Sequence, residues 1–404
     1  MGAESTFGQG IVIIMKTVIL AFSGGLDTSF AVIYLKKQGY KVITVTVNTG
    51  GFTKKQLEDI KKRAASLGAN KHYTVSCENE FFDKIIGNVI RANALYEGKY
   101  PLLCADRYII AEKVVGIAQK ENAEAIAHGS TAMGNDQIRF DSAFVSLAPE
   151  LKILSPIKET NFSREKEVAY LAENGYSVPL ISKKYSINEN SMGITISGSE
   201  IDLYEEPKIE SYKLTNQKPE AKSEYLKLYF KNGYPKKLNG ISLTGTRIIQ
   251  KLNQLVGSYG WGSDIYTGNC IIGIKGRIRF EAPGLLALIK AHQALEQLVL
   301  TKAQIDVNSV MRMYYSNHLY NGLYFDPIVK DIEGYFDINQ RNVEGEVVLK
   351  LSPFNLTVAS VKSPNTLVNK KIANYAQSCT WTKNDADGFI KLFTLQEKLA
   401  NLKK

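Results

Sequence analysis

From Thr17 onward, short runs of β-branched and other apolar residues alternate with longer amphipathic stretches. The runs Thr17 to Phe22 and Lys41 to Val47 are typical of strands that are buried on both faces. Further strands are expected at Lys71 to Val75, Ala125 to His128 and Ile153 to Ser155. This alternation predicts successive βαβ units and an open α/β domain with a parallel sheet.

The helices between these strands are located by their end signals. They are expected at about Thr28 to Gln38, from the capping-box pair Thr53 and Gln56 to Leu67, and at about Glu80 to Leu95, Arg107 to Lys120 and Arg164 to Asn174. Open α/β sheets bind ligands in loops beyond the carboxyl ends of their strands. The loops after Phe22, Val47 and His128 are therefore expected to converge on one crevice.

After Gly175 the alternation is lost, which indicates a second, α+β domain. The stretch from Ser182 to Lys222 is polar and is interpreted as a loop. Strands are expected at Tyr225 to Phe230, Ile271 to Ile274 and Val347 to Leu351, and a helix at Ala287 to Leu300. The amphipathic tail from about Ala386 is expected to be a helical arm that packs either on another subunit or on its own domain.

The length of 404 residues exceeds what one hydrophobic core usually holds. We expect a nucleotide-binding domain over residues 15–180, a second domain over 181–383 and a C-terminal helical arm over 384–404. Residues 1–14 are interpreted as an extension before a natural start at Met15, either native or added in cloning.

The formal net charge is +10, but basic and acidic residues are mixed in most stretches. This pattern favours solubility or a polyanionic small substrate such as ATP over a nucleic-acid surface. The four cysteines lie far apart without a CxxC motif, which is typical of a protein from a reducing compartment. Neither they nor the four histidines have the spacing of zinc ligands, which argues against a metal site built from protein side chains. The apolar stretch from Ile11 to Phe22 is too short for a membrane span.

The strongest chemical signal is the run Ala21-Phe22-Ser23-Gly24-Gly25-Leu26-Asp27-Thr28-Ser29, between the first strand and its helix. Glycines allow backbone N–H groups to turn inward, and the helix N-terminus adds partial positive charge. The run therefore predicts a phosphate cradle, in which Asp27 is suited either to cap the helix or to hold Mg²⁺. The lysine of a Walker A loop is absent, because no GK[ST] motif occurs in the chain.

A second run, from His128 to Phe140, follows a predicted strand. Gly129 allows close approach of a nucleotide, while Thr131, Asn135 and Asp136 suit an amino-acid ammonium and carboxylate. Arg139 is suited to a second carboxylate. Read by itself, the run is also compatible with a polar loop whose Asn and Asp residues make Asx turns.

The SGGxDxS loop resembles the pyrophosphate-binding motif of the N-type ATP pyrophosphatases, which cleave ATP between the α and β phosphates. The HGxTxxGNDxxRF pattern of the second run resembles argininosuccinate synthase, as do the stretches Asn93 to Tyr100 and Lys184 to Asn190. The resemblance covers Lys16 through the C-terminal helix. It implies an adenine nucleotide alpha-hydrolase-like domain followed by a synthetase domain.

The resemblance also implies ligand contacts. ATP would be held by Ala21, Phe22, Ser23, Gly24, Gly25, Leu26, Asp27, Thr28, Ser29, Val47 and Gly129. Aspartate would be held by Thr131, Asn135 and Asp136. Citrulline would be held by Tyr100, Asn135, Arg139, Ser186, Thr195 and Phe280. Mg²⁺ would accompany ATP, and Asp27 is its candidate ligand.

The implied reaction joins citrulline to aspartate through a citrullyl-adenylate, with release of AMP and pyrophosphate, in arginine biosynthesis and the urea cycle. A cytoplasmic homo-oligomer, a tetramer in the family, is implied with it, with no membrane or nucleic-acid partner. No covalent residue is assigned, and His128 and Asp136 are the candidate proton acceptors. The alternatives are a tRNA-modifying adenylating enzyme of the same fold and a nucleotide-binding relative with an altered citrulline pocket.

The chain departs from the family pattern on the citrulline side. Cys104 lies near the position of a usual serine, Gly268 stands where many members have Glu, and Phe280 stands in place of Tyr. A missing carboxylate would leave the α-ammonium of citrulline without a partner. Glu281 and Asp264 are the candidates to replace it.

Overall fold

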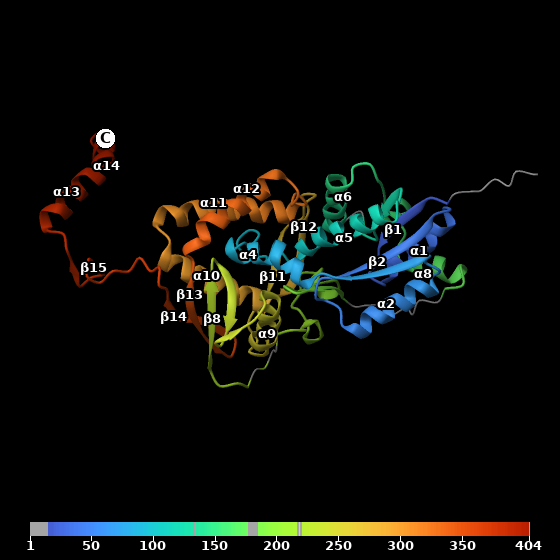
Figure 1. Cartoon of the computed structure of the whole chain (residues 1–404), viewed down its shortest axis with the longest axis horizontal. Coiled ribbons are helices and arrows are strands. Elements are labelled where there is room, and N and C mark those ends of the chain that lie inside the picture. Colours follow the sequence, from blue (N-terminus) through green and yellow to red (C-terminus); the bar gives the residue numbers. More distant parts are fainter. Residues whose placement is uncertain (1–14, 132–133, 177–184, 216–217, 219, 404) are drawn as a thin grey trace, which may run out of the picture.

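A computed structural model describes residues 15–131, 134–176, 185–215, 218 and 220–403. A parallel sheet with its helices forms one end of the molecule, and a second, mixed region forms the middle (Figure 1). The last helices extend away from both at the other end.

Five parallel strands form the first sheet in the order β3-β2-β1-β4-β5. Their bounds are Thr17–Ala21 for β1, Lys41–Asn48 for β2, Lys71–Ser76 for β3, Ala125–Ala127 for β4 and Lys152–Leu154 for β5. The predicted parallel sheet is confirmed, and each strand agrees with its predicted position to within one residue. The strand order reverses between β1 and β4, which is the point where such sheets bind ligands.

Both faces of this sheet are covered, which explains the uninterrupted apolar runs. Val18 and Leu20 of β1 pack in the cluster that contains Phe30 of helix α1 (Leu26–Lys37). Ile19, between them, packs in the opposite cluster with Tyr108 of α5 (Asp106–Lys120). Alternate side chains of one strand therefore enter two different cores.

The helices of this domain agree with the sequence prediction in most places. Besides α1 and α5 they are α2 (Lys54–Ser66), α6 (Asn135–Leu147), α7 (Pro156–Thr160) and α8 (Arg164–Glu173). The capping box of Thr53 and Gln56 is present. The single helix predicted from Glu80 to Leu95 is wrong, because this segment consists of α3 (Glu78–Phe81), a π-helical turn (Phe82–Ile86) and α4 (Gly87–Arg91).

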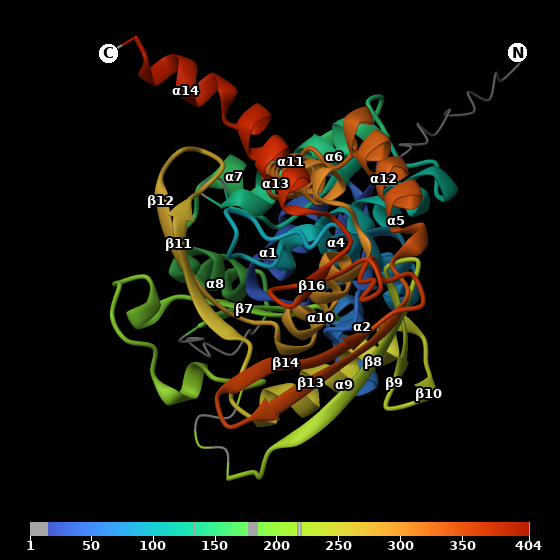
Figure 2. The ribbon, with the colours of Figure 1, turned by 90° about the vertical axis from the view of Figure 1, so that its left-hand side faces the viewer.

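The second domain contains two antiparallel sheets. One has the order β10-β9-β8-β13-β14, with bounds Ile241–Ser242, Tyr234–Leu238, Glu224–Lys231, Gly345–Ser352 and Asn355–Lys362. The other has the order β11-β12-β7-β6, with bounds Ser263–Asn269, Lys275–Glu281, Gly193–Ser197 and Ser186–Asn190. The helices are α9 (Gly245–Ser258), α10 (Pro283–Val299), α11 (Lys302–Asn321) and α12 (Pro327–Asn339). The predicted α+β domain is confirmed (Figure 2).

Two predictions in this domain are wrong. The stretch from Ser182 to Lys222 was expected to be a loop; its residues 182–184, 216–217 and 219 lie outside the described residues, but the stretch contains β6 and β7. The strand expected from Ile271 to Ile274 is the turn between β11 and β12, in which Gly273 has a φ of +86°. Apolar composition suggested a strand here, although Ile272 and Ile274 are exposed at the turn.

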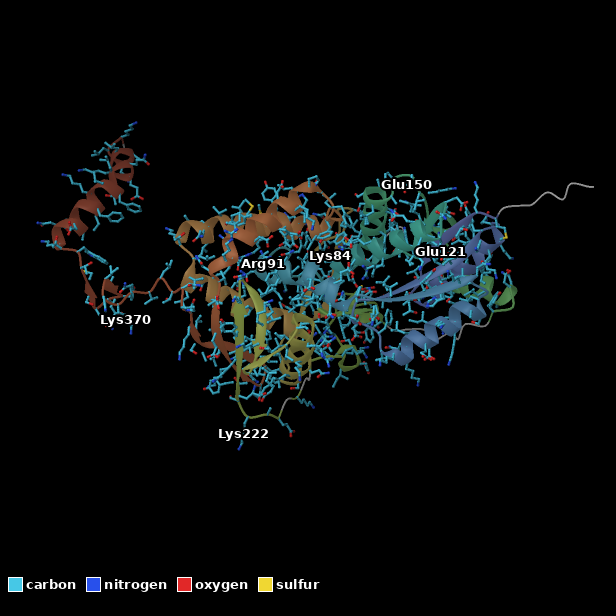
Figure 3. The ribbon with its side chains drawn as sticks, viewed as in Figure 1. Lys84, Arg91, Glu121, Glu150, Lys222 and Lys370 are labelled. Carbon is cyan, nitrogen blue, oxygen red and sulfur yellow. The ribbon has the colours of Figure 1, made fainter. Side chains whose placement is uncertain are left out.

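The two domains share one core, because the segment from α3 to α4 packs on the second domain. Arg91 at the end of α4 is 2% exposed and pairs with Asp337 of α12 at 2.6 Å (Figure 3). On the sheet side, the Ser191 hydroxyl donates to the carbonyl of Thr49 at 2.7 Å. The second contact holds the carboxyl end of β2 against the turn between β6 and β7.

The tail forms two helices, α13 (Lys383–Phe393) and α14 (Leu395–Asn401), and the predicted helical arm is confirmed as a helical element. None of their residues is buried, and Figure 1 shows them away from the body of the chain. Packing of the arm on another subunit stays a prediction. In the part of the chain that the structure describes, no helix is long and apolar enough to cross a membrane.

Candidate active site

The predicted phosphate cradle lies at the carboxyl end of β1, where a tight turn leads into α1. Gly24 has a φ of +73°, which L-residues with side chains rarely adopt. The hydroxyls of Thr28 and Ser29 donate to the carbonyl of Gly25 at 3.3 and 2.7 Å. No side chain caps the N-terminus of α1, so the N–H groups of its first turn are suited to bind a phosphate.

The loop after β4 touches this cradle. A Cβ built on Gly129 would lie 2.8 Å from Cγ2 of Thr28 and 3.3 Å from its backbone nitrogen. The loop after β1 is tied to the next strand, because the Thr46 hydroxyl donates to the carbonyl of Phe22 at 2.6 Å. The loops after Phe22 and His128 therefore meet at the switch point of the sheet, while Val47 is buried in the neighbouring strand.

Two carboxyl groups adjoin the first turn of α1. Asp27 lies in that turn, and Glu167 of α8, which is 2% exposed, contacts it. Burial, followed by the charge of Asp27 and a hydrogen bond to it, raises the pKa of Glu167 to about 8. One oxygen of Glu167, Oε2, has no hydrogen-bond partner. The sequence analysis identified Asp27 but not Glu167.

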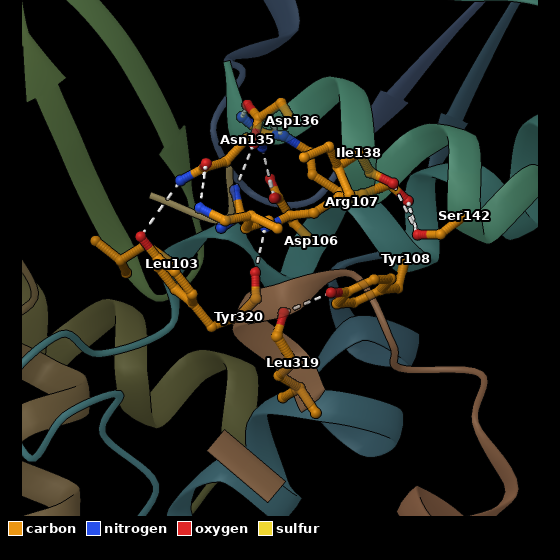
Figure 4. A network of polar contacts seen from close by, with 12 residues as sticks. Leu103, Asp106, Arg107, Tyr108, Asn135, Asp136, Ile138, Ser142, Leu319 and Tyr320 are labelled. Atoms are coloured by element: carbon orange, nitrogen blue, oxygen red, sulfur yellow. Dashed lines mark hydrogen bonds and ion pairs between the residues drawn. The ribbon is translucent and has the colours of Figure 1, made fainter. Parts of the chain in front are cut away.

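A clamp of two arginines surrounds Asp136 at the start of α6 (Figure 4). Arg107 donates to Oδ2 from Nε at 3.1 Å and from Nη2 at 2.8 Å, and Arg139 donates to Oδ1 at 2.8 Å. Burial disfavours the charged carboxylate, but the two guanidinium groups outweigh it and lower the pKa of Asp136 to about 2. Asp136 is therefore a firmly ionised group with little basicity.

Arg107 was missed by the sequence analysis. It donates from Nη1 to Oδ1 of its neighbour Asp106 at 2.5 Å as well as to Asp136. A signal was present in the adjacent pair Asp106-Arg107, directly after the segment that carries Tyr100. Nothing in the sequence placed this pair opposite Asp136.

Asn135 links the clamp to the second domain. Its Oδ1 accepts from the backbone N–H of Ile271, at the β11–β12 turn, at 2.9 Å. Its Nδ2 donates to the Tyr320 hydroxyl at 3.3 Å, and that hydroxyl donates to the carbonyl of Asn269 at 2.9 Å. Thr131, four residues before the start of α6, is exposed, and its carbonyl accepts from the Gly134 N–H at 3.3 Å.

His128 is fully buried at the end of β4. Its Nδ1 accepts from the Ser130 N–H at 3.1 Å, so Nε2 carries the proton of the neutral ring. Nε2 lies 2.8 Å from Oδ1 of Asp141 and 2.9 Å from the hydroxyl of Ser155. Both ring nitrogens are thus engaged by the protein.

An aromatic cluster surrounds the predicted citrulline residue Tyr100, which is 2% exposed. The ring centroids of Tyr266, Phe280 and Tyr320 lie 5.7, 5.9 and 6.0 Å from that of Tyr100. Tyr96 stacks on Tyr320 with centroids 3.6 Å apart. Burial is the main reason why the pKa of Tyr100 lies well above its ordinary value.

The second domain brings some of its predicted residues to this cluster and not others. Thr195 of β7 is paired with Phe280 of β12 and hydrogen-bonds the Tyr100 side chain. Ser186 is exposed at the start of β6, opposite Ser197. The structure therefore joins Tyr100, Thr195 and Phe280, and it records no contact between them and Ser186.

An open α/β sheet with a glycine-rich phosphate turn at its switch point defines a nucleotide-binding protein of the α/β class. A family model described as the arginosuccinate synthase N-terminal HUP domain matches residues 17–177, and one for the C-terminal domain of the same family matches residues 185–400. The chain belongs to the argininosuccinate synthase family.

Curated relatives match almost the whole chain. Argininosuccinate synthase of Xanthomonas campestris pv. campestris is 42% identical over 390 residues, which is 95% of this chain and 98% of that protein. The Pyrococcus furiosus protein of the same name is 41% identical over 391 residues, 95% of this chain and 94% of that one. The Dictyoglomus turgidum protein is 40% identical over 395 residues, 96% and 98%.

Proposed function

We propose that this chain is an ATP-dependent ligase that joins citrulline to aspartate, releases AMP and pyrophosphate, and serves arginine biosynthesis. The observation that carries the proposal is the phosphate turn from Ser23 to Ser29 held against Gly129, in a chain that matches both domains of one synthase family. Relatives that bear the name argininosuccinate synthase match it at about 40% identity over nearly the full length.

ATP is assigned to the switch point between β1 and β4. The backbone N–H groups around Gly24 and Gly25 and the start of α1 would hold the leaving pyrophosphate. Gly129 lets the loop after β4 approach Thr28 closely enough to close the cradle. Ala21, Phe22, Leu26 and Val47 complete this proposed set.

Mg²⁺ is assigned to Asp27. Among the described residues no group of three His, Cys, Asp or Glu side chains is suited to hold a metal ion. A magnesium ion that travels with ATP needs only one or two protein carboxylates, since phosphate oxygens and water supply the rest. Asp27, next to the unpartnered oxygen of Glu167, fits that requirement. When bound, the ion neutralises phosphate charge.

The amino-acid substrates are assigned to the clamp and the aromatic cluster. Thr131, Asn135 and Asp136 would orient aspartate, and Arg139 with Tyr100 would orient citrulline. Arg139 is held by Asp136 at 2.8 Å and by the carbonyl of Tyr320 at 3.0 Å, so its guanidinium is pre-positioned. Such fixed charges suit a reaction in which the ureido oxygen attacks the α-phosphorus and the aspartate amine then displaces AMP.

The two candidate proton acceptors receive different assignments. A carboxylate with a pKa of about 2 is a weak base near neutral pH, so Asp136 is assigned to binding. His128 has both nitrogens engaged and is assigned to holding the loop that carries Gly129. Neither assignment involves a covalent intermediate with the protein.

Substrate omission tests this function. Purified protein is given ATP, citrulline and aspartate, and pyrophosphate and AMP are measured with each substrate left out in turn. Release that does not depend on citrulline would refute the proposal. With aspartate omitted and ATP labelled with ¹⁸O in the α–β bridge, formation and reversal of the adenylate should move the label to non-bridging positions.

The same assay addresses the alternatives. Stimulation by tRNA in place of citrulline would favour a tRNA-modifying adenylating enzyme, although both family models favour the synthase.

We further propose a cytoplasmic homo-oligomer, a tetramer as the family resemblance implies. The cytoplasmic location is supported by the four free thiols, those of Cys77, Cys104, Cys270 and Cys379. The oligomer is supported by the exposed apolar residues of the arm.

A further inference from the structure

The proposed function assigns no residue to pair with the α-ammonium of citrulline, because Gly268 has no side chain. Glu281 is not available for this role. It is fully buried, and it accepts from Lys213 N–H, Leu214 N–H, the Thr215 hydroxyl and Arg279 at 2.5 to 2.9 Å. Asp264 pairs with Lys99 at 3.3 Å.

The space beside Gly268 is occupied by a phenol. A Cβ on Gly268 would lie 2.1 Å from the hydroxyl oxygen of Tyr266, a distance that real atoms do not adopt. The structure of β11 therefore requires glycine at this position as long as Tyr266 keeps its place. The Tyr266 hydroxyl in turn donates to Oε2 of Glu97 at 2.9 Å.

Glu97 lies in the turn between Tyr96 and Tyr100, both of which belong to the aromatic cluster. It is exposed and has a φ of +50°, which L-residues seldom adopt outside constrained or functional turns. The nearby Lys99 is paired with Asp264. Glu97 therefore presents an oriented carboxylate at the rim of the cluster.

The rings connect this carboxylate to the arginine clamp. The guanidinium of Arg139 lies 5.0 Å from the Tyr320 ring centroid, and that centroid lies 6.3 Å from the Tyr266 ring. An amino acid whose carboxylate is bound by Arg139 would hold its α-ammonium, which is on the same carbon, beside these rings. Its ammonium would then meet aromatic faces as well as Glu97, both of which attract a cation.

We propose that Glu97, oriented by Tyr266, pairs with the α-ammonium of the ureido substrate and so determines that the substrate is a free α-amino acid. This inference rests on the proposed function and adds a specificity residue to it. Tyr266 and Gly268 act through Glu97: the phenol orients its carboxylate, and the glycine leaves room for the phenol.

The test compares citrulline with 5-ureidopentanoate, which has the same side chain and carboxylate but no amino group. The wild-type protein should prefer citrulline. Glu97→Gln should lower kcat/KM for citrulline roughly 10- to 100-fold, mainly through KM, and change that for 5-ureidopentanoate by no more than about twofold. Tyr266→Phe keeps the ring, loses the hydrogen bond and should shift the preference in the same direction by less.

Three controls separate the outcomes. Glu150→Gln changes an exposed carboxylate between α6 and β5 that is not part of the cluster, and it should leave the preference unchanged (Figure 3). An unchanged KM for ATP in Glu97→Gln would verify that the protein is folded. A preference that survives in Glu97→Gln, or that is lost in Asp264→Asn instead, overturns the inference. If wild-type pyrophosphate release does not depend on citrulline at all, the proposed function fails, which is a different result.

Discussion

Replacing Gly129 with alanine should weaken ATP binding by crowding the phosphate turn. The added Cβ would lie 2.8 Å from Cγ2 of Thr28, roughly 1 Å closer than an ordinary carbon–carbon contact. Thr28 stands in the first turn of α1, and its hydroxyl donates to the carbonyl of Gly25, so a shift of Thr28 disturbs the cradle itself. Forcing an extra methyl group into packed structure costs about 1–3 kcal/mol.

That cost corresponds to a roughly 5- to 150-fold increase in the Kd for ATP, since each 1.4 kcal/mol is tenfold. The assay is pyrophosphate release with ATP varied at saturating citrulline and aspartate, supported by direct titration with ATP. The KM for citrulline should change little, because Gly129 does not contact the aromatic cluster in the described structure. Circular dichroism verifies that the variant is folded.

A second substitution makes this prediction sharper. Thr28→Ser removes Cγ2 and keeps the hydroxyl, so the nearest atom to the new Cβ becomes the Thr28 nitrogen at 3.3 Å. The double variant Gly129→Ala with Thr28→Ser should therefore recover much of the affinity lost in the single variant. Wild-type affinity in Gly129→Ala, or a double variant no better than the single one, would refute the packing argument.

Three further predictions concern stability, pH and assembly. Glu281→Gln leaves Arg279 buried without its counter-charge and should lower the free energy of unfolding by about 3–5 kcal/mol in urea titrations, whereas an unaltered value would mean that the pair is not structural. The pKa of Asp136 is lowered from 3.8 to about 2, so the stability that its ionised form contributes is present above pH 3.8 and is lost as the pH falls toward 2. In Asp136→Asn the free energy of unfolding should therefore depend less on pH across this range. Deleting residues 383–404 should leave the thermal midpoint of the body nearly unchanged, because no residue of α13 or α14 is buried. It should lower the sedimentation coefficient if the arm holds an oligomer together.

The parallel sheet was predictable because its strands are buried on both faces and therefore read as continuous apolar runs. The same reasoning failed at the turn between β11 and β12, where Ile271 and its neighbours are apolar and yet partly or largely exposed. It also failed at β6, whose sequence SINEN is polar because most of its residues face solvent at the edge of a sheet. Apolar or polar composition therefore predicts a strand only where the strand is buried.

The candidate site was predictable where a motif is contiguous and not where partners come from separate segments. The residues of the phosphate turn lie together in sequence, so glycines and hydroxyls could be interpreted as a group. Arg107 and Glu167 were missed, because the effect of each depends on a residue brought near it by the fold, Asp136 for one and Asp27 for the other. The nearby charges that shift the pKa values of Arg107 and Glu167 indicate that they belong to the site, whereas their residue types alone do not.

Asn135 indicates how the two domains cooperate in the proposed reaction. Both ends of its amide are bonded to the second domain, through Ile271 at the β11–β12 turn and through Tyr320 of α11. The same side chain is assigned to both amino-acid substrates, so a change in the turn should alter the KM for aspartate and citrulline together and leave that for ATP unaffected. Because ATP is assigned entirely to the first domain, we expect the domain contact to control the alignment of the two amino-acid substrates and the phosphate turn to control ATP binding.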